Sequence, residues 1–325
     1  MVPCGPSLGP TPSEDRVQEY RATTALVALI LALTTGWPTT VHADADTTDH
    51  ATGPVLRVMS FNLRYGTAAD GDHAWPQRRD LVRETIAAFD PDLLGTQECL
   101  AFQRDELADW LEGYAVEAAG RDDGREAGEM CASFHRTDRL ERLDGGTFWL
   151  SETPDVVASQ SWDAALPRIA TWLRLRERAS GTEILWINAH LDHAGPRSRR
   201  ESARLLHRWL AANAAGAMLV VTGDFNAPAS DDADAVHRIL RGDPETPLLV
   251  DTWEVAPAGS GEQPGAADQP AGTFHGFTGT PRPARIDWVL ATPSAAVLAA
   301  AIDRTGDGER WPSDHFPVTA VLRLP

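Results

Sequence analysis

The chain has 325 residues, of which 42% are hydrophobic and 23% are charged, a composition typical of globular proteins and unlike that of disordered chains. The formal net charge is -18, and every basic residue is an arginine. Such an acidic chain is unsuited to binding long duplex DNA along a basic groove. The three cysteines form no CxxC pair, which excludes a zinc finger and a covalently attached haem.

The first part of the chain has the pattern of an export signal. Two arginines precede the apolar run Ala25–Leu33, and Val41–Ala43 offers the small-x-small sequence that a signal peptidase prefers. The run is too short to cross a bilayer, which takes about 20 residues. We predict that residues 1–43 are a cleaved signal peptide, that the protein is secreted, and that no integral membrane segment remains. An uncleaved anchor is the alternative.

A polar spacer, residues 44–54, connects this signal to a single domain over residues 55–325. Removing residues 1–43 removes three acidic and two basic side chains, so the mature chain keeps a formal charge of about -17. Its two remaining cysteines, Cys99 and Cys131, are either bridged after export or two separate buried side chains.

Hydrophobic periodicity predicts an alternation of strands and helices through this domain. Expected strands are Val55–Tyr65, Leu93–Glu98, Glu129–Arg136, Gly146–Glu152, Thr171–Leu175, Glu183–His190, Leu219–Asn226, Arg285–Leu290 and Val318–Leu322. Expected helices are Trp75–Phe89, Phe102–Leu111, Arg197–Ala212 and Ala233–Leu240. The turn-rich stretch Pro257–Gly272 is expected to be a loop. No second domain boundary is evident.

Two polar side chains follow the buried strand that begins at Leu219. Asp224 and Asn226 stand two positions apart, so in an extended chain they point to the same side. There a carboxylate is able to activate a nucleophile while the amide holds developing charge. A simple turn after a core strand is the alternative, because Gly, Asp and Asn all favour turns.

The same arrangement, a polar residue after an apolar strand, recurs at other predicted strand ends. Polar residues lie at or just beyond these ends at Asn62, Glu98, His190, Asp287, Asp314 and His315. If the strands converge, these side chains converge too. Carboxylate and amide oxygens suit a hard cation such as Mg²⁺ or Mn²⁺ better than zinc or copper.

In their order along the chain these residues resemble the endonuclease/exonuclease/phosphatase superfamily. The motifs are SFN at Ser60–Asn62, QE at Gln97–Glu98, NAH at Asn188–His190, GDFN at Gly223–Asn226, RID at Arg285–Asp287 and SDH at Ser313–His315. The resemblance implies a four-layer α/β sandwich, with two mainly antiparallel sheets packed face to face and helices outside. It also implies metal-dependent hydrolysis of a phosphoester by in-line attack of water, without a covalent enzyme intermediate.

The resemblance also implies roles for individual residues. Metal-site residues are Asn62, Glu98 and Asp314, with Mg²⁺ or Mn²⁺ as the ion. Catalytic residues are His190, Asp224, Asn226, Asp287, His315 and Glu129. Among these, Asp224 is expected to position or deprotonate the attacking water, Asp287 to brace His315 against the phosphate, and Glu129 to orient His190.

Several further residues are candidates for substrate binding, and some of them have a structural alternative. Arg136 and His275 are predicted to bind substrate, although a salt bridge is an equal alternative for Arg136. Arg168 has the same two alternatives, phosphate binding or a salt bridge. His193 belongs either to a surface turn or to the site.

The substrate is left open by these motifs. We expect a monomer that acts on a small phosphoester or a short oligonucleotide, without stable binding of duplex DNA. Alternatives are a lipid phosphodiesterase of the sphingomyelinase type, a nonspecific nuclease, and a binding protein that has lost catalysis. The sequence lacks a membrane-inserting hydrophobic hairpin, and none of the six motifs is broken.

Overall fold

The computed structural model describes residues 53–232, 235–260 and 271–325. The chain divides into two units, Met1–Thr47 and Thr48–Pro325, and only the second is described. The expected signal peptide and its cleavage site therefore lie outside the described residues. Within the described part, no helix has both the length and the apolar character needed to cross a bilayer.

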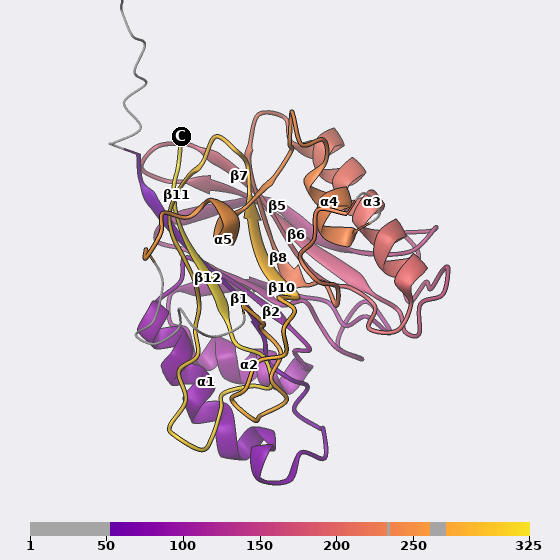
Figure 1. The fold of residues 1–325 in the computed structure, drawn as a ribbon, viewed down its shortest axis with the longest axis vertical. Helices are drawn as coiled ribbons and strands as arrows, with labels where there is room; N and C mark the ends of the chain where they lie inside the picture. The colour runs from indigo at the N-terminus through magenta and orange to yellow at the C-terminus, as the bar shows by residue number, and fades with distance from the viewer. Residues whose placement is uncertain (1–52, 233–234, 261–270) are drawn as a thin grey trace, which may run out of the picture. The chain divides into compact units, whose positions relative to one another are not determined.

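In the described part of the chain, twelve strands form two six-stranded sheets (Figure 1). In spatial order the first sheet contains β11 (Ala296–Ile302), β12 (Val318–Arg323), β1 (Val55–Asn62), β2 (Leu93–Gln97), β4 (Ser133–Arg136) and β3 (Tyr114–Glu117). The second contains β5 (Leu140–Trp149), β6 (Ile169–Glu177), β7 (Glu183–His190), β8 (Met218–Asp224), β10 (Asp287–Ala291) and β9 (Val250–Asp251). Each sheet has one parallel pair, β1 with β2 and β7 with β8, and its other pairs are antiparallel.

Helices cover the outer face of each sheet. The helices α1 (Trp75–Phe89) and α2 (Ala101–Trp110) pack on the first sheet, and α3 (Pro196–Asn213) and α4 (Val236–Arg241) pack on the second (Figure 1). A third apolar layer lies between the sheets. The predicted four-layer α/β sandwich is thereby confirmed. A short 3-10 turn, Gly71–His73, precedes α1, and α5 (Thr252–Val255) packs beside β10.

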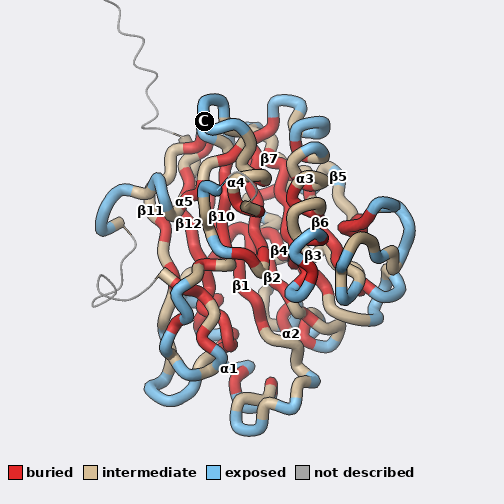
Figure 2. Tube along the Cα trace, turned by 45° about the vertical axis from the view of Figure 1, so that its right-hand side comes forward, coloured by how far each residue is buried: buried red, intermediate tan, exposed pale blue. Residues whose placement is uncertain are grey.

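Figure 2 shows that the strands are largely buried. Side chains point alternately to the two faces of each strand, and this alternation also determines where the polar residues lie. In β7, Leu185 and Ile187 face α3, while Trp186 faces the other sheet. Because side chains two positions apart share a face, Asn188 and His190 continue the inward row of Trp186. The same parity applies to β1 and β8. The inner face of the sandwich thus changes from apolar to polar as these strands approach their carboxyl ends.

A buried hydrogen-bonded layer joins the sheets beneath those ends. Gln97 on β2 donates to Asn188 Oδ1 on β7 over 2.7 Å, and Thr222 Oγ1 on β8 donates to the same oxygen over 3.1 Å. Asn188 in turn donates to Thr96 O over 2.9 Å. Gly95 permits this approach, since an added Cβ would lie 2.4 Å from Thr222 Oγ1. The sheets are therefore locked in one register directly under the polar strand ends.

The structure also corrects several expected boundaries. Strand β5 begins at Leu140 rather than Gly146, with a register shift between Arg142 and Asp144. Five of the described elements were not predicted: β3, β9, α5, β11 and the 3-10 turn Gly71–His73. The first two residues of the expected helix Ala233–Leu240 lie outside the described residues, and α4 itself begins at Val236.

The two cysteines of the domain are not bridged. Cys99 and Cys131 are free and buried, which confirms the second of the two alternatives. Burial raises the pKa of each thiol to about 12.

Candidate active site

The polar strand ends converge on one cleft of about 960 Å³. Its lining includes seven of the predicted site residues: Glu98, Glu129, His190, Asp224, Asn226, Asp314 and His315. Two more, Asn62 and Asp287, are buried and hydrogen-bonded to members of this group. The elements that supply them belong to both sheets, so the cleft exists only when the sandwich is assembled.

Asn62 connects the carboxylates of the two sheets. Its amide nitrogen donates to Asp224 Oδ2 over 2.9 Å and to Glu98 Oε1 over 3.1 Å. Its Oδ1 accepts the backbone N–H of Arg64 over 2.9 Å. In this arrangement Asn62 is a donor that bridges Glu98 and Asp224, and its oxygen is turned toward the backbone rather than toward the carboxylates.

The acidic end of the cleft has the donor chemistry of a hard-cation site. Glu98 and Asp314 are close enough that the charge of Glu98 raises the pKa of Asp314, after the larger effect of burial. Arg64 lies 3.9 Å from Asp314, but it is held by a two-pronged pair with Asp70 at 2.9 and 3.0 Å. Asp314 is buried and Glu98 is half-buried, and their oxygens are the ligand type that Mg²⁺ or Mn²⁺ prefers, while His315, Arg64 and Arg78 offset part of the charge on Asp314.

Three residues at this end have left-handed backbones. The φ angles are 55° at Arg64, 56° at Glu98 and 47° at Asn226. Asparagine adopts this region at little cost, whereas for longer side chains such conformations cost about 1 to 3 kcal/mol and cluster at functional sites. Glu98 follows the last residue of β2, so this turn redirects its side chain into the cleft.

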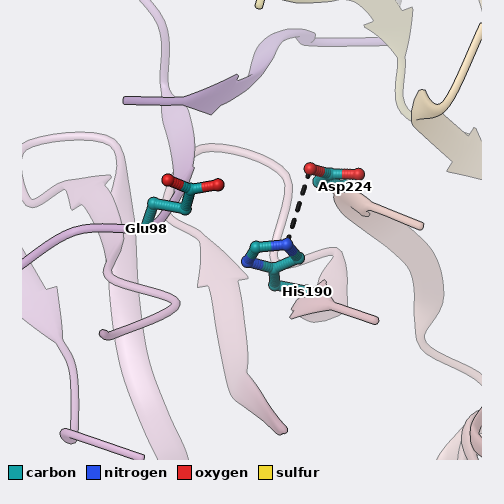
Figure 3. Close-up of side chains that lie close together, drawn as sticks. All are labelled: Glu98, His190 and Asp224. Carbon is teal, nitrogen blue, oxygen red and sulfur yellow. Dashed lines mark ion pairs between the residues drawn. The ribbon is translucent and has the colours of Figure 1, made fainter. Parts of the chain in front are cut away.

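His190 lies between the two carboxylate groups, facing Asp224 and Glu98 (Figure 3). Its Nε2 is 3.5 Å from Asp224 Oδ2 and 3.0 Å from the amide nitrogen of Asn226. The side-chain nitrogen of Asn226 also donates to Leu191 O. This second hydrogen bond fixes the orientation of the Asn226 amide. The proton of a neutral His190 ring is therefore on Nδ1, toward Glu129 Oε2 at 3.8 Å.

The charge state of His190 follows from its surroundings. Burial, and after it the positive charges of Arg168 and Arg121, hold the pKa of His190 well below its usual value. Arg121 also binds Glu129 through two hydrogen bonds of 2.8 Å. His190 is therefore neutral at pH 7 in this arrangement, with Glu129 on one side and Asp224 on the other.

His315 has the opposite electrostatic environment. Burial alone would lower the pKa of His315, but Asp287 and Asp224 outweigh it and raise that pKa well above the usual value. Its Nδ1 is 2.9 Å from Asp287 Oδ2, and its ring meets the edge of Phe274. Burial and the charge of Asp287 raise the pKa of Asp224 to about 7. The cleft thus combines a neutral histidine with a cationic one.

The structure does not bring Arg136 to this site. It pairs with Asp90 and Asp92 and contacts Tyr114. Because β4 is antiparallel to β2, its carboxyl end lies beside the beginning of β2, at the edge of the sheet opposite Glu98. The structure therefore places Arg136 away from the cleft lining and in salt bridges, the second of its two alternatives.

His275 lies beside the cleft without lining it. Its side chain is buried and stacks on Phe316 with 4.0 Å between ring centroids, and burial lowers the pKa of His275 to about 3. Its backbone N–H, with that of Gly276, donates to Asp314 O. His275 therefore anchors the segment that carries Phe274 and Phe277, which do line the cleft.

Several cleft residues were missed or left undecided by sequence reasoning. They are Arg64, Tyr65, Asp70, Arg121, Leu166, Arg168, His193, Phe274, Phe277 and Arg282. Arg64 and Tyr65 directly follow Asn62, so their position after a motif was a usable signal. Arg121 lies in a charged loop, and nothing in the sequence of that loop indicates that Arg121 faces the site.

A second cluster of metal-ligand residue types is an ion-pair network. His237, Asp251 and Glu254 lie close together away from the cleft lining. Arg285 binds Asp251 at 2.7 Å, and Arg241 binds Glu254 at 2.9 Å. These arginines already supply the counter-charge, so the cluster does not need a metal ion.

Comparison with known proteins agrees with the fold and the motifs. The model of the "Endonuclease/Exonuclease/phosphatase family" matches residues 59–315. A solved protein of that description from Bacteroides vulgatus is 33% identical with a TM-score of 0.74, over 84% of this chain and 100% of the other. A mannosyl-6-phosphatase from Bacteroides thetaiotaomicron is 33% identical with a TM-score of 0.72, over 83% and 100%.

More distant structures share the fold. The human Nocturnin catalytic domain is 19% identical with a TM-score of 0.62, and the match covers 84% of this chain and 96% of that domain. This likeness concerns architecture only. The family match, by contrast, spans all six motifs from SFN to SDH. The chain belongs to the endonuclease/exonuclease/phosphatase family.

Proposed function

We propose that the protein is a secreted, divalent-metal-dependent phosphoester hydrolase whose preferred substrate is a compact phosphomonoester such as a sugar phosphate. The observation that carries the proposal is the convergence of Glu98, Asp224 and Asp314 with a neutral and a cationic histidine in one cleft. This set offers carboxylates for a hard cation, a group to hold water, and positive charge for phosphoryl oxygens.

Glu98 and Asp314 are proposed to hold Mg²⁺ or Mn²⁺, with Asn62 contributing after a turn of its amide. The bound ion would neutralise charge on the phosphoryl oxygens. Asn62 keeps Glu98 and Asp224 in fixed relation through its two donated hydrogen bonds. Residues of the chain are assigned the activation of water, the contact with the phosphoryl oxygens and the stabilisation of the leaving oxygen.

Asp224 is proposed to position and deprotonate the attacking water. One oxygen accepts the backbone N–H of Asn226 over 2.9 Å and the other accepts the Asn62 amide, so the carboxylate is preorganised. His315, braced by Asp287, would contact the phosphoryl oxygens. His190, backed by Glu129 and Arg121, would stabilise charge on the leaving oxygen, which takes its proton from bulk water. Attack in line with that oxygen requires no covalent intermediate.

Two observations favour a compact monoester. One relative at 33% identity is a mannosyl-6-phosphatase. In addition, three of the cleft arginines are already paired with acids, Arg64 with Asp70, Arg121 with Glu129 and Arg168 with Asp192. Few positive charges therefore remain to follow a long polyanion.

A short oligonucleotide is the second candidate. Phe274 and Phe277 line the cleft, and aromatic rings of this kind stack on bases without sequence preference. Arg282 lies over the Phe274 ring at 4.6 Å from its centroid and faces no described carboxylate. This aromatic and basic edge gives a nucleotide a place to bind beside the scissile phosphate.

A substrate panel tests the proposal. We would assay a hexose 6-phosphate, p-nitrophenyl phosphate, nucleotides, oligonucleotides, duplex DNA and sphingomyelin liposomes with Mg²⁺ and with Mn²⁺. The proposal expects the fastest turnover on a compact monoester and a shallow salt dependence. Fastest cleavage of duplex DNA, with an affinity loss of about 10³ to 10⁵ between 50 and 200 mM salt, would instead indicate a nonspecific nuclease. Folded protein that cleaves none of them would support a binding role.

A further inference from the structure

A hydrogen-bonded array beside His190 holds His193, a residue that has no part in the proposed chemistry. His193 is exposed and lines the cleft, and its Nδ1 lies 2.9 Å from Arg168 Nη2. Arg168 is only 4% exposed and its Nε lies 3.4 Å from Asp192, which is fully buried. An exposed imidazole is thus held at the cleft by a buried guanidinium and a buried carboxylate.

Asp192 makes this array rigid. One of its oxygens accepts the backbone N–H groups of Ala194 and Gly195, and the other accepts that of Ala165. These bonds tie the turn after β7 to the loop before β6. A surface turn does not require a buried arginine with one amino group, Nη1, left without a hydrogen-bond partner. The arrangement is costly for a purely structural turn, and it orients one side chain toward the cleft.

The hydrogen bond also fixes which nitrogen of His193 faces the substrate. A guanidinium only donates, so Nδ1 of His193 is an acceptor. In the neutral ring the proton therefore lies on Nε2, the nitrogen not used by Arg168. Nε2–H is a directed donor suited to an uncharged oxygen acceptor, such as a hydroxyl group.

The position of this donor relates it to the leaving alcohol. His193 follows His190 in the turn after β7, and both line the same cleft. The proposed function assigns the leaving oxygen to His190. Leu166, 37% exposed, adds an apolar surface to the same lining. A ring that carries hydroxyl groups on an apolar carbon frame matches this combination of a fixed donor and an apolar contact.

We propose that His193, positioned by Arg168 and Asp192, binds a hydroxyl group on the alcohol part of the substrate and so selects sugar and polyol phosphates over phosphates without hydroxyl groups. This inference rests on the proposed function and specifies its substrate class. His193 is a specificity residue in this account, and Arg168 is a positioning residue.

The test compares two substrates in one enzyme. For His193→Ala and the wild type, kcat/KM is measured with a hexose 6-phosphate and with p-nitrophenyl phosphate, whose alcohol has no hydroxyl group to bind. The ratio of the two values should fall by about tenfold in the variant, the scale of one lost hydrogen bond. His193→Gln, whose amide is able to donate from a similar position, should restore part of the ratio. Arg197→Ala, an exposed neighbour outside the cleft lining, should leave it unchanged.

A second measurement locates the contact. Deoxy analogues of the hexose phosphate, each lacking one hydroxyl group, are assayed with both enzymes. For one analogue the loss caused by His193→Ala should disappear, because the two deletions remove the same hydrogen bond. Arg168→Lys should lower the same substrate ratio while keeping the charge.

The outcomes separate this inference from the proposed function. A wild type that cleaves neither monoester refutes the proposed function, and this inference with it. A wild type that cleaves both, combined with equal losses on both substrates in His193→Ala or with no loss at all, refutes only the role of His193. Additive losses for every deoxy analogue would also refute it.

Discussion

The side-chain amide of Asn62, at the end of β1, donates to Asp224, at the end of β8 in the opposite sheet, over 2.9 Å. This bond crosses the interface between the two sheets inside the cleft. The proposed nucleophile-positioning group and the proposed metal ligands are therefore held in relation by the packing of the sandwich itself.

The first prediction concerns the two residues assigned to proton transfer and charge stabilisation. Asp224→Asn and His190→Ala should each lower kcat by at least about a hundredfold, the scale of losing a general base or one preorganised stabiliser. Steady-state kinetics on the best monoester measures this, with circular dichroism to verify folding. Asp231→Asn, an exposed acid outside the cleft lining, is the matched control and should retain activity. Near-wild-type turnover in either site variant would refute its assigned role.

The second prediction concerns the close contact of the sheets. A Cβ at Gly95 would lie 2.4 Å from Thr222 Oγ1 and 2.7 Å from Asn188 Oδ1. Gly95→Ala should therefore lower the free energy of unfolding by about 1 to 3 kcal/mol, as overpacked cores do. Urea denaturation measures the change. Gly146→Ala, also in a strand, places its Cβ 3.4 Å from Trp172 and should cost less. Equal stability of the two variants would contradict the close-contact argument.

Sequence reasoning identified the strand ends but not the directions of pairing. Asn62, His190 and Asp224 were found because an apolar strand delivers each of them, and the alternation of side chains then fixes their common face. Arg136 also ends a strand, yet β4 runs antiparallel to β2 and carries Arg136 to the opposite edge. A local pattern contains no information about which neighbour a strand pairs with.

Elements whose sequences lack a clear apolar pattern could likewise not be predicted from the sequence. Strand β11 is largely alanine, and the first half of β5 is polar and half-exposed. Both form because a neighbouring strand offers hydrogen bonds, a tertiary effect that periodicity does not record. The bidentate pair of Arg121 with Glu129 had no local signal either, since it closes a loop of irregular backbone.

The third prediction concerns stability in acid. Burial, followed by the charge of Arg142, lowers the pKa of His135 to about 4, whereas an unfolded histidine titrates near 6.5. The unfolded chain therefore takes up this proton at higher pH. The resulting stability is complete above about pH 6.5 and is lost as the pH falls toward about 4, by about 1 to 3 kcal/mol.

Urea denaturation between pH 4 and pH 8 checks this assignment. His135→Leu keeps an apolar side chain of similar size and removes the titration. The difference in unfolding free energy between wild type and variant should change over pH 4 to 6.5 and stay constant above it. A constant difference over the whole range would show that His135 is not responsible.

The fourth prediction concerns export. The apolar run Ala25–Leu33 is short and a small-x-small sequence follows it, so residues 1 to about 43 should be removed. Intact-mass measurement of protein from the culture medium determines the new N-terminus. A chain that still begins at Met1 and stays in the membrane fraction would establish the uncleaved anchor instead.

The central claim is that a hard divalent cation, held by Glu98 and Asp314, makes this cleft a phosphoester hydrolase. The most direct measurement is hydrolysis of a hexose 6-phosphate by metal-stripped protein during titration with Mg²⁺ or Mn²⁺, in the wild type and in Glu98→Gln. We expect EDTA to abolish turnover and added metal to restore it. Glu98→Gln should need at least about tenfold more metal, the scale of weakening a metal site. Full activity in EDTA, or an unchanged metal requirement in the variant, would contradict the account.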